Sequence, residues 1–104
     1  MVARVTRYRI RPGKVKEFAA TTESLTAHLD KLDGFRALIV LQGEDPEGRE
    51  ATAISVWDSA EQLKSSENDS FYYEAIKRLM GYCESFSPMH LHQVIHSKFN
   101  NPKC

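Results

Sequence analysis

The sequence predicts an α+β chain of element order β-α-β-β-α-β, built around a four-stranded antiparallel sheet. Apolar or alternating stretches typical of strands lie at 2–10, 35–42, 50–57 and 89–96. Between the first and second of these, and again between the third and fourth, the inward residues recur with the three–four spacing of a helix. The simplest packing of this order covers one face of the sheet with both helical segments, which is the ferredoxin-like arrangement.

The first strand and the first helix are separated by a change of period. Val5 lies on one face of the strand, Tyr8 and Ile10 lie on the other, and Pro12-Gly13 ends it. The helix then begins, with its inward residues at Val15, Phe18, Thr22, Leu25, Leu29 and Leu32. Asp33-Gly34 ends the helix, because glycine readily takes the left-handed conformation that follows a last helical turn.

The second half begins with a hairpin. The loop GEDPEG joins the strands at 35–42 and 50–57, and Asp58 and Ser59 then provide helix caps. A short helix is expected to about residue 66. After a break, a second helical stretch has its inward residues at Phe71, Tyr72, Ala75, Ile76, Leu79 and Cys83. Pro88 closes this stretch before the last strand.

Length and composition limit the classes of protein. The 104 residues correspond to one domain, expected over 1–98, with a flexible tail at 99–104. Basic and acidic residues number 14 each, so no nucleic-acid partner is expected. Cys83 and Cys104 do not make a disulfide framework. The first residues lack the apolar core of a signal peptide, and no apolar run approaches the roughly 20 residues of a membrane span, so a cytoplasmic protein without a membrane partner is expected.

The strand FRALIVLQ at 35–42 is apolar on both faces, with Ala37, Ile39 and Leu41 on one face and Leu38 and Val40 on the other. Two helices cover only one face of a sheet, so the other face would leave a large apolar patch in water. The sequence therefore predicts a homodimer that forms through the open face of the sheet.

Four segments, RYRIRPGKVKEF, LDGF, SVWDSAEQL and SFYYEA, together resemble the antibiotic biosynthesis monooxygenase (ABM) domain superfamily over about residues 2–95. The resemblance implies a dimeric α/β barrel of ferredoxin-like protomers. It also implies a monooxygenase that needs no cofactor and acts on a small aromatic or enolisable substrate. The pocket would lie between the sheet and its own helices, and Trp57, Phe71 and Tyr72 match motif positions by residue type.

A haem-binding or haem-degrading relative is a further alternative within the same superfamily, but its three required features are missing. That branch has an asparagine on the first strand, a tryptophan inside the helical segment and a histidine ligand on the second helix. The corresponding residues here are Thr6 or Arg7, Ser65 or Ser66, and Ala75 or Ile76. Many members also have a histidine in the helix after the strand-end tryptophan, where this chain reads KSSEN.

The candidate catalytic residues are His28, Tyr72 and His92. A histidine beside an apolar pocket is a suitable general base, and a tyrosine hydroxyl can hydrogen-bond a phenolate. The candidate substrate-binding residues are Trp57, Phe71, Ile76 and Leu25. Each has a structural alternative: Trp57 as a core aromatic that closes one end of the fold, Tyr72 as a packing residue, and His28 as a half-exposed surface residue.

Two further groups of polar residues receive structural interpretations. His90, His92 and His96 share one face of the last strand, where an H-x-H pair can ligate a transition metal. No carboxylate or cysteine stands beside them in sequence, so no metal is expected. The arginines of the first strand, which are Arg4, Arg7, Arg9 and Arg11, are expected on a solvated, salt-bridged edge.

Two functions from different classes remain. In the first, the chain is a monooxygenase in which Trp57, Phe71 and Tyr72 shape the pocket and His28 or His92 accepts a proton. In the second, it is a non-catalytic homodimer that binds a small hydrophobic or aromatic ligand. The first predicts a buried polar group that points into a hollow between helices and sheet. The second predicts that side chains fill this hollow and that the histidines are exposed.

Overall fold

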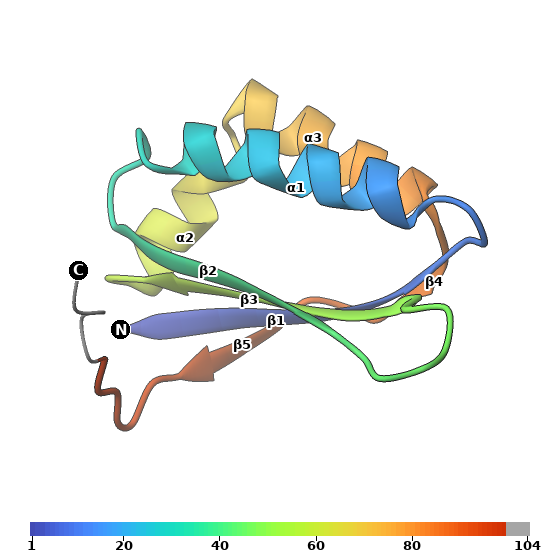
Figure 1. Cartoon of the computed structure of the whole chain (residues 1–104). Helices are drawn as coiled ribbons and strands as arrows, with labels where there is room; N and C mark the ends of the chain where they lie inside the picture. The colour runs from blue at the N-terminus through green and yellow to red at the C-terminus, as the bar shows by residue number, and fades with distance from the viewer. Residues whose placement is uncertain (100–104) are drawn as a thin grey trace, which may run out of the picture.

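The computed structural model describes residues 1–99. Its elements are β1 (Val2–Ile10), α1 (Val15–Leu29), β2 (Phe35–Gln42), β3 (Glu50–Trp57), α2 (Ala60–Ser66), α3 (Ser70–Gly81), β4 (Cys83–Phe86) and β5 (His90–Gln93). Figure 1 shows two layers, with α1 and α3 lying together over one face of the sheet. Over residues 1–99 no helix is both long and apolar enough to cross a membrane. Of the predicted tail, residues 100–104, including Cys104, lie outside the described part.

The sheet has the order β2-β3-β1, and β4 and β5 then share the next position. β4 pairs with the Tyr8–Ile10 end of β1, whereas β5 pairs with the Val2–Val5 end. Every pairing is antiparallel, so the predicted α+β ferredoxin-like fold is confirmed. One strand was expected at 89–96. The chain instead forms two short strands around Pro88, which lacks the N–H that a continuous ladder requires.

The helices are shorter than their periodicity predicted. α1 ends at Leu29, and the N–H of Leu32 then donates to the carbonyl of Leu29 over 3.0 Å, which closes a tight turn. α3 ends at Gly81, so Cys83 begins β4 instead of continuing the helix, although it is buried as its spacing indicated. The predicted cap at Ser59 is confirmed, since its hydroxyl accepts from the backbone N–H of Gln62 over 3.2 Å.

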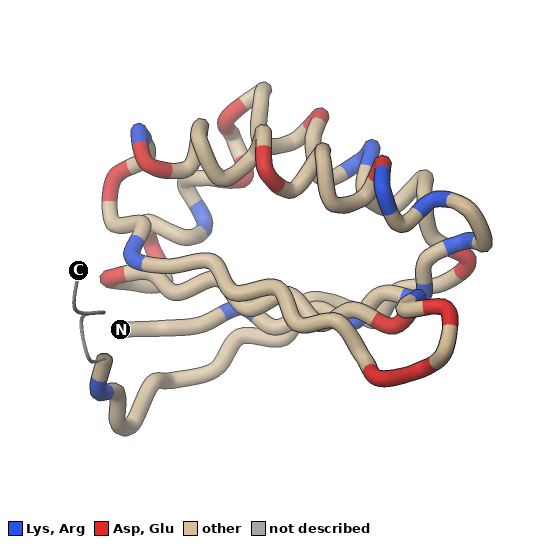
Figure 2. Tube along the Cα trace, viewed as in Figure 1, with Lys and Arg blue, Asp and Glu red and all other residues tan. Residues whose placement is uncertain are grey.

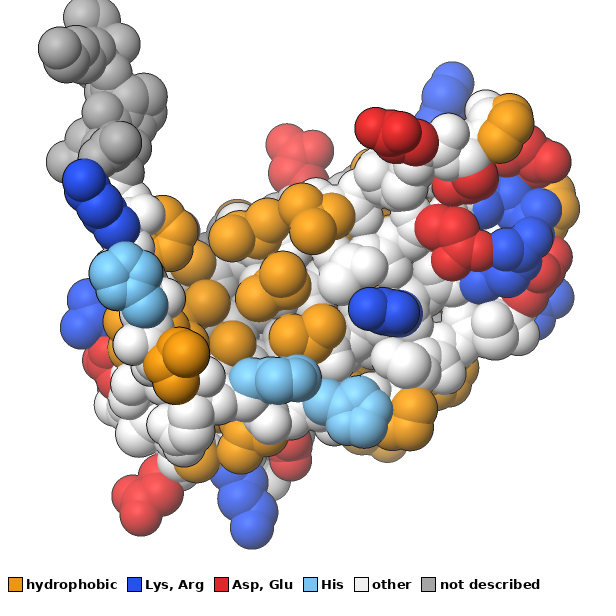
Figure 3. Space-filling view, turned by 90° about the horizontal axis from the view of Figure 1, so that it is seen from below, with side chains coloured by type: hydrophobic (Ala, Val, Ile, Leu, Met, Phe, Trp, Pro, Cys, Tyr) orange, Lys and Arg blue, Asp and Glu red, His pale blue; other side chains and the backbone are white. Residues whose placement is uncertain are grey.

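The helices leave the other face of the sheet uncovered. On this open face lie Ile39 and Leu41 of β2, which are 39% and 51% exposed, and the strand register adds Val5, Ile54 and Val56. Figure 3 shows apolar side chains gathered in one area of this face with histidine side chains beside them. Figure 2 shows that β2 and β3 carry no charged residue along most of their length. The open face is therefore the large apolar surface that the sequence predicted.

Candidate functional site

A hollow of about 40 Å³, here called the inner chamber, lies between α1, α3 and the covered face of the sheet. Its volume holds on the order of three water molecules. The residues that line it come from both helices and four strands or loops. They are Arg4, Thr6, Tyr8, Phe18, Thr22, Leu25, Leu29, Leu38, Val40, Ala53, Ser55, Tyr72, Ile76, Leu79 and Met89. A small apolar chamber with a few polar groups is thus present where a ligand site was expected.

The most unusual group in the inner chamber is the guanidinium of Arg4, because its side chain is only 7% exposed. Its Nη1 donates to the Tyr72 hydroxyl over 2.5 Å, and its Nη2 donates to Glu67 Oε1 over 2.9 Å. Glu67 lies at the end of α2 and is half exposed. The expectation of a solvated edge is therefore wrong for Arg4. In β1 the side chains at positions 4, 6 and 8 point toward the helices, and Arg4 finds its partners there.

Burial is the main influence on the pKa of the two tyrosine hydroxyls in the inner chamber. It raises the pKa of Tyr8 to about 12, with a smaller contribution from the neighbouring Tyr72. Burial also raises the pKa of Tyr72, although the Arg4 guanidinium opposes the shift. Both tyrosines are therefore neutral near pH 7 and act as hydrogen-bond donors, not as bases. Because the Tyr72 oxygen accepts from Arg4, its own O–H can still donate to a ligand.

Three of the predicted site residues, Tyr72, Leu25 and Ile76, line the inner chamber. The other four, which are His28, Trp57, Phe71 and His92, are not among the described lining residues. The structure thus brings together the inward positions of α1 and α3. It separates them from the strand-end tryptophan and from the histidines.

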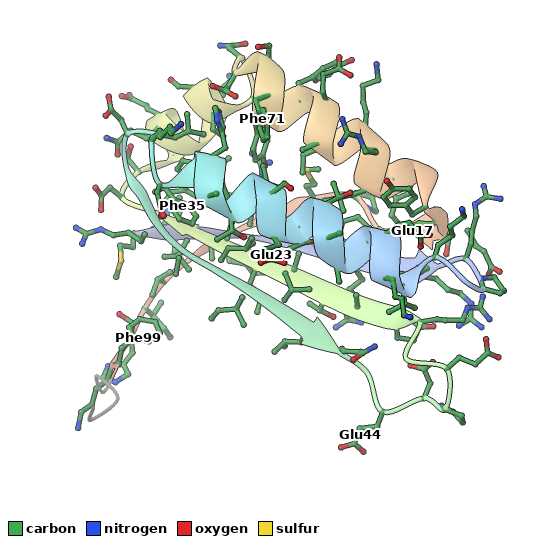
Figure 4. The ribbon with its side chains drawn as sticks, turned by 45° about the horizontal axis from the view of Figure 1, so that its top comes forward. Glu17, Glu23, Phe35, Glu44, Phe71 and Phe99 are labelled. Atoms are coloured by element: carbon green, nitrogen blue, oxygen red, sulfur yellow. The ribbon has the colours of Figure 1, made fainter. Side chains whose placement is uncertain are left out.

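His28 joins the two helices instead. Its Nε2 lies 2.8 Å from Asp69 Oδ1, and its ring stacks on Phe71 with centroids 4.4 Å apart. The Asp69 side chain also caps α3, because it accepts from the backbone N–H of Tyr72 over 2.9 Å. This N–H, and then His28, lowers the pKa of the Asp69 carboxyl. Figure 4 shows Phe71 at the start of α3, on the helix layer and away from the sheet.

Trp57 is fully buried, with 0% of its surface exposed. Its ring meets Phe35 edge to face with centroids 5.4 Å apart, and its Nε1 donates to Ser55 Oγ over 3.1 Å. The indole is therefore a satisfied core group at the end of β3. Only its partner Ser55 reaches the inner chamber.

His92 and His90 lie on the open face, where they line a shallow hollow with Val5, Arg7 and Ser87. His96 follows β5, outside any strand. Among residues 1–99, no group of three or more histidine, cysteine, aspartate or glutamate side chains is arranged to hold a metal ion.

A second and larger cavity, here called the outer groove, lies between α1 and the β2–β3 hairpin and measures about 350 Å³. It shares Phe18, Thr22 and Val40 with the inner chamber. Its other lining residues are Ile10, Val15, Ala19, Glu23, Leu41, Gln42, Gly48 and Ala51. The shared wall makes the two cavities neighbours.

Sequence reasoning missed Arg4, Thr6, Tyr8 and Ser55 as chamber residues. The sequence signal that could have identified them is the alternation of side chains between the two faces of a strand. Tyr8 and Ile10 were already assigned to one face of the first strand, and the same period of two puts Arg4 and Thr6 with them. In β3, Ser55 shares a face with Trp57 for the same reason.

The sequence model of a family described as antibiotic biosynthesis monooxygenase matches residues 1–78. A conserved protein from Methanosarcina mazei Go1 has a solved structure that aligns with a TM-score of 0.79 at 22% identity, over 88% of this chain and 90% of that one. SnoaB, a cofactor-independent oxygenase from Streptomyces nogalater, aligns with a TM-score of 0.80 at 16% identity, over 92% and 94% of the two chains. At these identities the likeness concerns the fold alone. Among proteins with curated descriptions, none matches this sequence.

Proposed function

We propose that this chain, which belongs to the antibiotic biosynthesis monooxygenase family, is a cofactor-independent monooxygenase for a small aromatic ketone that can enolise. The observation that carries the proposal is the buried Arg4 guanidinium, which shares the inner chamber with the Tyr72 hydroxyl. A cation and a phenolic donor in a largely apolar space stabilise an oxyanion far better than water does.

The ligand's carbonyl oxygen would lie against Arg4 and Tyr72. An activated ring CH2 group conjugated with that carbonyl loses one proton, and the resulting enolate is held by the two side chains. The enolate carbon gives its electrons to dioxygen and bonds to it, and protonation yields a CH–OOH unit. Loss of water leaves a new carbonyl, so that CH2 and O2 become C=O and H2O. The substrate itself is the reductant in this sequence.

The protein's contribution is then stabilisation of the enolate. The described lining of the inner chamber contains no histidine or carboxylate, and its tyrosines are protonated near neutral pH. The proton therefore passes to water, and Arg4 lowers the pKa of the ligand through its charge. This geometry favours Arg4 and Tyr72 over His28 and His92 as the groups that promote enolisation.

The volumes of the two cavities define where such a ligand fits. The inner chamber of about 40 Å³ would receive the carbonyl group, whereas the outer groove of about 350 Å³ has room for a ring system. A ligand that spans the wall of Phe18, Thr22 and Val40 would present its carbonyl oxygen to Arg4 and keep its remaining rings in the groove.

Tyr72→Phe is expected to lower the rate of oxygen consumption with 1,8-dihydroxyanthrone about 10- to 100-fold, because it removes one donor to the developing oxyanion. Tyr73→Phe is the matched control, since Tyr73 is the adjacent residue and its side chain is exposed to solvent. An oxygen electrode measures both, after subtraction of the anthrone's spontaneous oxidation. Equal rates for the two variants would contradict the proposed role of Tyr72.

The same experiment separates the proposal from the second candidate function, a homodimer that binds a ligand without turnover. The small volume of the inner chamber is the observation that favours this candidate. This second candidate predicts that the anthrone binds to the protein under anaerobic conditions. It also predicts that native protein does not raise the rate of oxygen consumption above the spontaneous rate.

We also propose that the active form is a homodimer joined through the open face. The apolar residues there would be removed from water by the same residues of a second copy. Ile54→Glu, near the middle of this face, is expected to convert a dimer into a monomer by light scattering at micromolar concentration. Tyr73→Glu on α3 is the control and is expected to stay dimeric. A monomeric native protein would contradict the proposal.

A further inference from the structure

The outer groove differs from the inner chamber in the polar side chains that its walls contain. Its described lining is mainly apolar and contains three polar side chains, Thr22, Glu23 and Gln42. The Thr22 hydroxyl donates its proton to the carbonyl of Phe18 over 2.9 Å, and the Gln42 amide donates to the carbonyl of Gly48 over 2.9 Å. What these side chains still offer a ligand is therefore mainly acceptor capacity.

Glu23 is the charged residue of this lining, and its carboxylate makes no ion pair with any of residues 1–99. Figure 4 shows Glu23 on α1, on the side of the helix nearest β2. A carboxylate at the rim of an apolar groove attracts a cation, and exposure to solvent keeps this attraction moderate.

The two neighbouring cavities thus differ in the charge of their ionisable lining residue. The inner chamber presents the Arg4 guanidinium, which suits an enolate oxygen, and the outer groove presents the Glu23 carboxylate. The wall between them, made of Phe18 and Val40 with the methyl of Thr22, is apolar. The order of these surfaces, from cationic through apolar to anionic, is complementary to a ligand with an oxyanion at one end, an apolar middle and a cation at the other end.

We propose that the outer groove is a second subsite, in which Glu23 binds a protonated amino group at the far end of the aromatic substrate. This inference rests on the proposed function and narrows its substrate class to amine-bearing enolisable ring ketones. Glu23 is a specificity-determining residue in this arrangement, because it contacts the part of the ligand that does not react. Since Glu23 is exposed, its effect on affinity is moderate, about tenfold between a cationic and an anionic ligand.

The test uses three probes that share a 1,8-dihydroxyanthrone ring and carry an aminomethyl, a hydroxymethyl or a carboxymethyl group on the outer edge of one terminal ring, away from both the carbonyl and the reacting CH2. Anaerobic calorimetric titration gives a Kd for each without turnover. Native protein is expected to bind the aminomethyl probe about tenfold more tightly than the carboxymethyl probe, with the hydroxymethyl probe between them. Glu23→Gln is expected to abolish most of this preference.

Glu17→Gln is the matched control, because Glu17 is another α1 carboxylate, labelled in Figure 4, that is absent from the described lining of the groove. It removes the same charge from the same helix and is expected to retain the tenfold preference. Equal affinities of native protein for the three probes would overturn the subsite. So would an equal loss of preference in both variants, or no binding of any probe.

Oxygen consumption with the unsubstituted anthrone is measured in parallel, so that the two proposals fail separately. If native protein accelerates its oxidation without any preference among the three probes, the subsite is wrong and the monooxygenase function stands. If the preference depends on Glu23 while oxidation is not accelerated, the subsite stands and the proposed function is wrong.

Discussion

Arg4→Met is expected to lower the rate of oxygen consumption at least 100-fold while it changes the free energy of unfolding by only about 1 kcal/mol. The loss of rate follows from the removal of the charge that stabilises the enolate in an apolar chamber. Stability is retained because methionine fills the space of the alkyl stem, and the half-exposed Glu67 carboxylate regains water. Arg4 is therefore expected to affect the ionisation of a bound ligand much more than the stability of the folded protein.

Arg7→Met is the matched control for this experiment. Arg7 is in the same strand, but its side chain lies on the open face and is exposed. It is expected to keep the native rate within about twofold at saturating substrate, because Arg7 is absent from the described lining of the inner chamber and methionine is compatible with the apolar open face. A rate that falls equally in both variants would indicate that total charge matters, and not the position of Arg4 in the chamber. Urea unfolding of each variant provides the stability comparison.

Trp57→Ala is expected to lower the free energy of unfolding by about 3–5 kcal/mol, the largest stability effect of any single substitution described here. The indole is fully buried against Phe35 and donates to Ser55, so its removal leaves both a cavity and a hydroxyl without its partner. For a domain of this length such a loss approaches the total stability. Trp57→Phe refills part of the cavity and is expected to cost less than half as much.

Unfolding in urea, followed by circular dichroism, measures the three proteins. Trp57→Phe is the informative variant for function, because it folds without the indole. If Trp57 is a core residue, as its burial indicates, this variant binds 1,8-dihydroxyanthrone with nearly native affinity. A variant of native stability whose affinity is reduced tenfold would instead make Trp57 a wall of the ligand site.

The fold was predictable because each element carries its own local signal. The alternation of β1, the three–four spacing of α1 and the cap at Ser59 each act within a few residues, and together they allow one simple packing. The last strand was harder to predict. Whether the residues around Pro88 form one strand or two depends on their pairing with opposite ends of β1, and that pairing is not encoded in the local pattern.

The site was predictable only where a helical stripe faces the sheet. Tyr72, Leu25 and Ile76 lie in such stripes and reach the inner chamber. Arg4 is expected from sequence on a solvated, salt-bridged edge because arginine side chains are mostly exposed. Its burial depends on Tyr72 and Glu67, which are more than sixty residues away, and such long-range partners cannot be inferred from spacing. For Trp57 the sequence leaves a core and a pocket-wall interpretation open, and its full burial on the same face of β3 as Ser55 favours the core.

The central claim is that the inner chamber holds a ligand's enolate against Arg4 and Tyr72, and anaerobic absorbance titration tests it most directly. When 1,8-dihydroxyanthrone is added to native protein near pH 7 without oxygen, we expect the long-wavelength band of its enolate to grow with occupancy. The same titration of Arg4→Met is expected to give the spectrum of the neutral ketone. A neutral spectrum with native protein at saturation, or an enolate band of equal size in both proteins, would contradict the account.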